Sequence, residues 1–286
     1  MKTRNLILLA AAAAMVMACK TKTPEEKLAE FNEWNETFVE NYRTRLTELK
    51  DDPEAAEAFA DSAYNAYIEY NKEALNKNLD NVVGIEALKQ VYSDLEPEEL
   101  AKVLDKLSAP VTGRDSAFVA HLKENVAASL ATAVGQPFTD FTVEHVIGTD
   151  KEGNPVYENR SLSDYVGKGK IFLVDFWSPW CPPCKAELPN IKSVWEKYHG
   201  EDFDVLSVAV WEESRGMNWR NTIDTAAVYG IQWNQINNGH QEPATLYGIQ
   251  GIPHMVLFGA DGTIIARGDA LRGQALDPAV AAALGK

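Results

Sequence analysis

The fold of this chain is decided by the stretch Ile171-Phe172-Leu173-Val174-Asp175-Phe176-Trp177-Ser178-Pro179-Trp180-Cys181-Pro182-Pro183-Cys184. Its apolar first half predicts a buried strand, and the Cys-x-x-Cys that follows opens a helical pattern. An offset of three residues brings both sulfurs within bonding reach at a helix start, where the helix dipole favours a thiolate. The stretch therefore predicts a redox centre, in which Cys181 at the exposed helix start attacks and Cys184, one turn inside, resolves the mixed disulfide.

This motif with its flanks, and the later Gly251-Ile252-Pro253, resembles the thioredoxin family over roughly residues 136 to 286. Within that family the chain is similar to the membrane-tethered, extracytoplasmic TlpA/ResA-type thiol-disulfide oxidoreductases. Two features carry this closer likeness: the lead-in Gly135-Gln136-Pro137-Phe138-Thr139-Asp140-Phe141 and the acid Glu187, three residues after Cys184. Asp175 departs from the tethered branch and matches the buried acid of cytoplasmic thioredoxin.

Two acids are candidates for proton transfer. Asp175 lies in an otherwise apolar strand, and burial raises the pKa of a carboxyl, which leaves it able to take and return a proton near neutrality. The resemblance implies that Asp175 deprotonates Cys184 during resolution. Glu187 is the alternative acid; in the tethered branch a glutamate here belongs to the active site, but one helical spacing fits a solvent-exposed helix face equally well.

The resemblance also implies a substrate-binding edge beside the sulfurs. Pro253 is expected to follow a cis peptide bond, which places the Ile252 backbone where an extended substrate segment can pair with it. His254 stands where thioredoxins commonly have threonine, and it either tunes Cys181, donates a hydrogen bond or is an ordinary polar strand residue. Trp180 is expected on an exposed docking rim. Trp233, in the stretch before Pro253, either recognises substrate or packs in the core.

The cysteine pair has competing interpretations. Half of a zinc site would need two more ligands, and the sequence offers only scattered histidines, so no metal site is expected. The other competing interpretation of the pair is an inert structural disulfide. Because Pro182 and Pro183 lack amide hydrogens, two donors that would stabilise a thiolate are missing, and we expect a reducing thiol rather than a strongly acidified one.

The N-terminal residues have the pattern of an export signal. Lys2 and Arg4 precede an apolar stretch from Leu6 to Met17, and the segment 1–18 is too short to span a membrane. Cys19 directly after Ala18 resembles a bacterial lipobox, in which the cysteine is acylated, although the methionine at position 17 is atypical. The expected location is the cell envelope, as a membrane-anchored lipoprotein facing the periplasm; simple secretion with a free Cys19 is the alternative.

Composition narrows the partners and cofactors. The 286 residues carry a formal net charge of −15, which argues against nucleic acid as a partner. With three cysteines in all, the domain depends on core burial rather than structural disulfides. No Gly-x-Gly-x-x-Gly follows a strand, so we expect no nicotinamide or flavin and no cofactor beyond the redox-active disulfide Cys181–Cys184. Electrons are then expected from a membrane reductant relay.

The hydrophobic periodicity changes at Gly135. Apolar spacings of three, four and seven predict an all-helical domain over residues 19–134, with helices separated at Asp51-Asp52-Pro53 and interrupted at Gly84. Residues 135–286 alternate strands and helices, which predicts an α/β thioredoxin-like domain with a central mixed sheet and helices on both faces. The expected strands are 141–146, 171–176, 203–210, 254–258 and 263–268, with a short extended segment at 233–236.

These observations predict an extracytoplasmic thiol-disulfide oxidoreductase that reduces or exchanges disulfides in exported proteins through its Cys-Pro-Pro-Cys centre. One alternative is a thiol peroxidase of the neighbouring peroxiredoxin type, which would favour a lone nucleophile without a partner cysteine. The other is a non-catalytic lipoprotein whose helical half binds a partner.

Overall fold

The structure, a computed structural model, describes residues 22–237 and 239–286. The expected signal segment 1–18 and Cys19 lie outside the described residues. Contacts between Cα atoms divide the chain into two compact units: residues up to Asp94 with Lys106–Asp115, and Leu95–Asp105 with Ser116–Lys286. The domain boundaries after residues 18 and 134 stay predictions.

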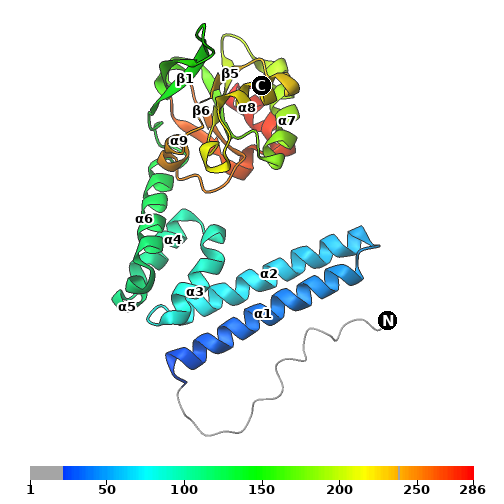
Figure 1. The fold of residues 1–286 in the computed structure, drawn as a ribbon, viewed down its shortest axis with the longest axis vertical. Coiled ribbons are helices and arrows are strands. Elements are labelled where there is room, and N and C mark those ends of the chain that lie inside the picture. Colours follow the sequence, from blue (N-terminus) through cyan, green and yellow to red (C-terminus); the bar gives the residue numbers. More distant parts are fainter. Residues whose placement is uncertain (1–21, 238) are drawn as a thin grey trace. The chain divides into compact units, whose positions relative to one another are not determined.

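The first unit is helical, as the sequence predicts. Its helices are α1 (Pro24–Glu48), α2 (Pro53–Lys77), α3 (Val82–Val91) and the short α5 (Ala109–Thr112). Figure 1 shows α1 and α2 side by side and antiparallel, and aromatic rings stack between them, with the Trp34 and Tyr70 centroids 3.4 Å apart. No helix in residues 22–237 and 239–286 is both long and apolar enough to cross a membrane.

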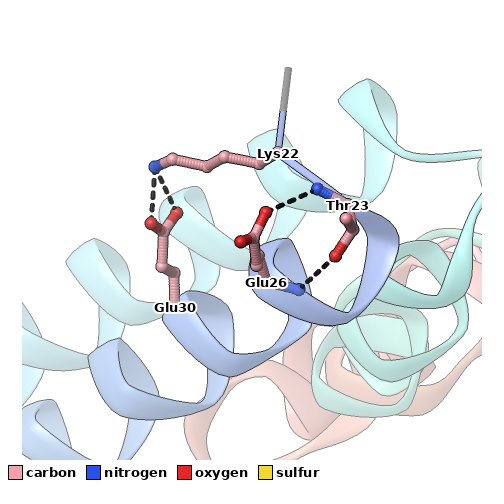
Figure 2. Close-up of polar contacts among 4 residues, drawn as sticks. All are labelled: Lys22, Thr23, Glu26 and Glu30. Carbon is pink, nitrogen blue, oxygen red and sulfur yellow. Dashed lines mark hydrogen bonds and ion pairs between the residues drawn. The ribbon is translucent and has the colours of Figure 1, made fainter. Parts of the chain in front are cut away.

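The start of α1 is fixed by its own side chains. Thr23 accepts a hydrogen bond from the Glu26 N–H at 3.2 Å, and the Glu26 carboxylate accepts one from the Thr23 N–H at 2.8 Å, which is a capping box (Figure 2). Lys22 forms an ion pair with Glu30 beside it. Asp52 is the N-cap of α2, and its side chain accepts a hydrogen bond from the Ala55 N–H at 3.1 Å. These caps satisfy amides that have no partner inside the helix.

Gly84 does not interrupt a helix, contrary to the expectation from its low helix propensity. It lies within α3, where an added Cβ would come 2.1 Å from the carbonyl oxygen of Asn78. The glycine is therefore required by the close approach of the preceding turn to the helix.

The second unit contains α4 (Pro97–Lys106, up to Asp105), α6 (Ser116–Ala131) and the thioredoxin-like fold (Figure 1). Its five-stranded sheet has the order β5-β4-β3-β6-β7. Strands β3, β4 and β5 are parallel, whereas β6 and β7 run antiparallel, so the predicted mixed sheet is confirmed. The strands are β3 (Ile171–Trp177), β4 (Phe203–Ala209), β5 (Asn234–Ile236), β6 (His254–Phe258) and β7 (Ile264–Arg267).

Each face of this sheet has its own buried cluster. One face packs against α7 (Pro182–Tyr198) and α10 (Leu276–Ala283), and its cluster includes both cysteines of the motif. The other packs against Tyr247 and α9 (Glu242–Leu246). Helices thus cover both faces, as predicted, and α8 (Trp219–Tyr229) precedes β5. Since side chains alternate along a strand, Asp175 shares the face of Leu173 and Trp177, which is the face of the cysteines.

Two elements of the second unit were not predicted. The strand β2 (Pro155–Ser161) pairs antiparallel with β1 (Thr142–Thr149) in a separate two-stranded sheet. The side chain of Asn237 joins this sheet to the end of β5, because it accepts from the Val146 N–H at 2.9 Å and donates to the Val146 carbonyl. The other missed element is α9, which is only five residues long.

Candidate active site

The cysteine pair lies at the junction of β3 and α7. Cys181 is the N-cap of α7, and its Sγ accepts a hydrogen bond from the Cys184 N–H at 3.1 Å. The two sulfurs form a disulfide, with an S–S distance of 2.06 Å. Pro182 and Pro183 form the first turn, where helices tolerate proline well. The sulfur that caps the helix is thus placed where the N-terminal dipole and one amide stabilise negative charge.

Both cysteines are buried in this disulfide form. Cys181 is 2% exposed and Cys184 is 1% exposed, so the expectation that Cys181 lies exposed at the helix start is wrong for this state. The reason lies in the loop before β6, where the carbonyl oxygen of Ile252 is 3.6 Å from the Cys181 Sγ. The bond between Ile252 and Pro253 is cis, as the resemblance implied. The loop thus places the Ile252 backbone beside the sulfur.

Asp175 is buried beneath the helix. It is 1% exposed, and burial raises its pKa from 3.8 to about 7, helped by the negative charge of Glu187 and opposed by a hydrogen bond from Ser207. Its Oδ1 has no hydrogen-bond partner within the described part of the chain. A carboxyl in this environment exchanges a proton near neutrality, which is the property needed of a general acid–base group.

Glu187 is also buried, at 8% exposure. Its Oε1 accepts the Gly273 N–H at 2.8 Å and the Asn190 side-chain amide at 3.1 Å. The alternative of a solvent-exposed helix face is therefore wrong. Glu187 lies one turn beyond Cys184 on α7, and it adds a second carboxylate to the cysteine-bearing face of the sheet.

Trp180 forms the edge of the site next to Cys181. It is partly exposed, and its indole N–H donates to the carbonyl of Trp211 at 3.1 Å. The Arg215 guanidinium lies over the Trp180 ring at 4.7 Å from its centroid, a cation–π contact. Trp211 adopts a left-handed φ of 58°, and its carbonyl also accepts from the Ser214 hydroxyl. The loop after β4 is thus hydrogen-bonded to Trp180, the tryptophan that precedes Cys181.

His254 is the first residue of β6. Because side chains alternate along a strand, it shares a face of the sheet with Val256 and Phe258, which is the face opposite the cysteines. There its Nε2 lies 3.2 Å from a guanidinium nitrogen of Arg267. Arg267 also donates to the carbonyls of Thr132 and Tyr247, both at 2.7 Å. Burial and then the positive charge of Arg267 lower the His254 pKa to about 4. Substrate binding by His254 stays a prediction. Its side chain contacts Arg267 on β7, and Arg267 in turn donates to the Thr132 carbonyl just after α6.

Sequence reasoning missed two residues and left a third open. Ser207 on β4 and Arg267 on β7 were not singled out, although Ser207 is the lone hydroxyl in the apolar run of its strand and this signal marks it. Trp233 was left open between core and substrate recognition; it is 6% exposed and donates its indole N–H to Ser207 Oγ at 2.8 Å. It is therefore a core residue. Within residues 22–237 and 239–286, no three His, Cys, Asp or Glu side chains converge as metal ligands do.

Comparison with known proteins now places this geometry in a family. The model of the AhpC/TSA family matches residues 134–267. A thiol-disulfide oxidoreductase ResA from Geobacillus thermodenitrificans is 30% identical over 134 residues, which are 47% of this chain and 68% of the relative. The chain belongs to the family of this relative. It is a thioredoxin-like thiol-disulfide oxidoreductase of the ResA type.

Other known proteins are similar to the same part of the chain. A second ResA, from Halalkalibacterium halodurans, is 28% identical over 137 residues, which are 48% of this chain and 68% of that protein. Among solved structures, the thioredoxin domain of a thiol-disulfide oxidoreductase from Bacteroides vulgatus is 27% identical and covers 52% of this chain and 95% of its own, with a TM-score of 0.40. The family match lies in the second unit, where the cysteine pair is found.

Proposed function

We propose that this oxidoreductase reduces or exchanges disulfides in exported proteins through Cys181 and Cys184, outside the cytoplasm. The observation that carries the proposal is the position of the Cys181 sulfur. It caps α7, it is bonded to Cys184, and it lies 3.6 Å from the Ile252 carbonyl, in a loop whose backbone can pair with an extended substrate.

The reaction proceeds in two exchanges. The Cys181 thiolate attacks one sulfur of a substrate disulfide, which forms a mixed disulfide and releases the first substrate thiolate. Cys184 then passes its proton to the Asp175 carboxylate and attacks the Cys181 sulfur, which releases the second substrate thiolate. Two electrons move from the cysteine pair to the substrate, and the released thiolates take up protons. Glu187 supplies a further negative charge near this transfer.

Substrate segments are proposed to lie along Trp180 on one side and the Ile252–Pro253 loop with His254 at its strand start on the other. The protein needs no bound cofactor for these exchanges because the electrons reside in the thiols. A membrane reductant relay is proposed to return the oxidised pair to dithiol. Acylation of Cys19 is proposed to anchor the protein to a membrane in the cell envelope, facing the periplasm.

Trapping of the mixed disulfide tests the cysteine roles. A Cys184→Ser variant retains the attacking thiol and loses the resolving one, so it should accumulate a covalent complex with a peptide disulfide; Cys181→Ser should form none. Equal trapping by both variants would refute the assignment. The reduction potential of the Cys181/Cys184 pair then tests the direction of electron flow. A value of about −270 mV supports a reductase, and one of about −120 mV makes the protein an oxidant.

The anchor is tested separately. Full-length protein grown with a labelled fatty acid should carry the label and sediment with membranes, whereas Cys19→Ala should lose both properties. Unlabelled wild-type protein in the soluble fraction would overturn the anchor and leave the redox proposal untouched.

A peroxidase remains the second candidate because the matching family model is AhpC/TSA. The bonded partner Cys184 on the same helix argues for disulfide exchange instead. Consumption of hydrogen peroxide by the reduced protein that survives in Cys184→Ser, without reduction of peptide disulfides by wild type, would favour the peroxidase.

A further inference from the structure

A chain of three side chains from neighbouring strands runs through the core behind the cysteine pair. Asp175 and Ser207 are aligned partners in the parallel pairing of β3 with β4, and Ser207 Oγ lies 3.4 Å from Asp175 Oδ2. Trp233, just before β5, donates its indole N–H to the same Ser207 oxygen at 2.8 Å. All three side chains are buried, and the two outer ones share a face with Cys184.

The direction of the two hydrogen bonds follows from what each group can do. An indole N–H is a donor only, so Ser207 must accept from Trp233. The hydroxyl then has one hydrogen left to donate, and the carboxylate oxygen of Asp175 is the acceptor in front of it. In a low-dielectric interior the first bond polarises the hydroxyl and strengthens it as a donor to the second.

Among the described residues, the side chains that act on the Asp175 pKa are Ser207 and Glu187, and neither is basic. From α7, the groups near it are the cysteines and Glu187, whose negative charge opposes ionisation of Asp175. From β6, the aligned partner is Met255, which carries no charge. From β4 the aligned residue is Ser207. Ser207 is thus the group that favours the ionised carboxylate, whereas burial and Glu187 act against it.

We propose that Ser207, oriented by Trp233, is a positioning residue of the reaction: it holds its hydrogen toward the Asp175 carboxylate and thereby sets the pH at which Asp175 can take the proton of Cys184. Ser207 touches neither substrate nor sulfur in this mechanism. The proposal rests on the proposed function for its kinetic part, because Asp175 must act as the proton acceptor. Its structural part, the control of Asp175 by Ser207, stands on the geometry alone.

The first experiment measures the Asp175 titration directly, in the oxidised protein, where the cysteines do not titrate. The full chain is labelled with ¹³C at aspartate carboxyls, and the Asp175 signal is identified by its loss in Asp175→Asn. Ser207→Ala should raise the Asp175 midpoint by about one pH unit, since a neutral donor to the charged form is removed. Trp233→Phe should raise it by less, and Ser207→Thr, which retains the hydroxyl, should restore the wild-type midpoint.

Ser178→Ala is the matched control. Ser178 directly follows β3, the strand that carries Asp175. It is fully buried, and its hydroxyl has no hydrogen-bond partner among the described residues. Its loss should leave the Asp175 midpoint unchanged. An unchanged midpoint in Ser207→Ala, or an equal shift in Ser178→Ala, would overturn the proposal. If Ser207→Ala fails to fold, Trp233→Phe is compared with wild type instead. The absence of an upward shift of the Asp175 midpoint in Trp233→Phe would then refute the proposal.

The second experiment measures resolution of the mixed disulfide against pH in a single turnover. Ser207→Ala should move the rise in rate upward in pH by the same amount as the titration midpoint, and should have no effect in an Asp175→Asn background. A titration shift without a rate shift would refute the role of Ser207 in the reaction.

The two proposals can fail separately. If Cys181→Ser reduces peptide disulfides as fast as wild type, the proposed function fails whatever the titration shows. If Cys181→Ser is inactive but Ser207→Ala changes neither the Asp175 midpoint nor the rate, only the Ser207 proposal fails.

Discussion

Replacing the buried acid by its amide should make the stability of this protein much less sensitive to pH. The pKa of Asp175 is about 7 in the folded chain against 3.8 for the ordinary side chain, because burial disfavours the charge. A shift of this size corresponds to about 4 kcal/mol of free energy. Asp175→Asn should therefore stabilise the oxidised protein by up to about 4 kcal/mol above pH 8, and scarcely at all near pH 4.

The sign follows from proton binding. Because the folded-state pKa is raised, the folded chain holds a proton between pH 4 and 7 that the unfolded chain has released. The free energy of unfolding is therefore highest below pH 4, falls as the pH rises through about 7, and is constant above that. Only the wild type carries this dependence on Asp175; the asparagine variant has no carboxyl to ionise.

The assay is guanidinium denaturation of the disulfide form at pH 4, 5.5, 7 and 8.5, followed by tryptophan fluorescence. The measured quantity is the difference between variant and wild type, which removes the contributions that both chains share. Asp224→Asn is the control, because Asp224 is an exposed acid on α8 and its difference from wild type should be small at every pH. A constant difference between Asp175→Asn and wild type from pH 4 to 8.5 would refute the reasoning.

Two further predictions come from close contacts. Gly84→Ala should destabilise the first unit by about 1–3 kcal/mol, because the new Cβ meets a backbone oxygen at 2.1 Å, whereas Gly113→Ala, with nothing within 4 Å, should cost far less; equal denaturation midpoints for the two variants would contradict this. Glu187→Gln should lower the Asp175 midpoint in the ¹³C titration, because a negative charge that disfavours its ionisation is removed, and an unchanged midpoint would show that the two carboxyls do not interact.

The elements with strong local signals could be predicted from the sequence. The strand β3 lies where its apolar run predicts it, α7 begins within the cysteine motif as expected, and α1 and α2 are separated at the expected Asp51-Asp52-Pro53. The two missed elements of the second unit have weak signals: β2 has the sequence PVYENRS and buries few of its side chains, and α9 is only five residues long. Gly84 was misinterpreted because its helix propensity is visible in the sequence and the backbone that approaches it is not.

The residues of the candidate site also divide into those that a local sequence signal marks and those that it does not. Cys181, Cys184 and Pro253 are contained in short motifs, and burial of Asp175 follows from its apolar neighbours in the chain. The partners of those residues depend on register between strands that are far apart in sequence. Ser207, for example, lies 32 residues from Asp175, its aligned partner on β3. A parallel pairing with a helical crossover leaves no mark in the sequence that says which residues become aligned.

The two buried acids illustrate why those partners matter for the chemistry. Glu187 has two N–H donors on Oε1, from Gly273 and Asn190, whereas Asp175 has one long hydrogen bond and an oxygen without a partner in the described chain. The negative charge of Glu187 in turn raises the pKa of Asp175. Paired acids in unlike environments can take different roles, one as a fixed charge and the other as the group that exchanges the proton. The hydrogen bonds assign the exchanging role to Asp175, and they make the Ser207 hydroxyl the point at which that exchange can be adjusted without changing a charge.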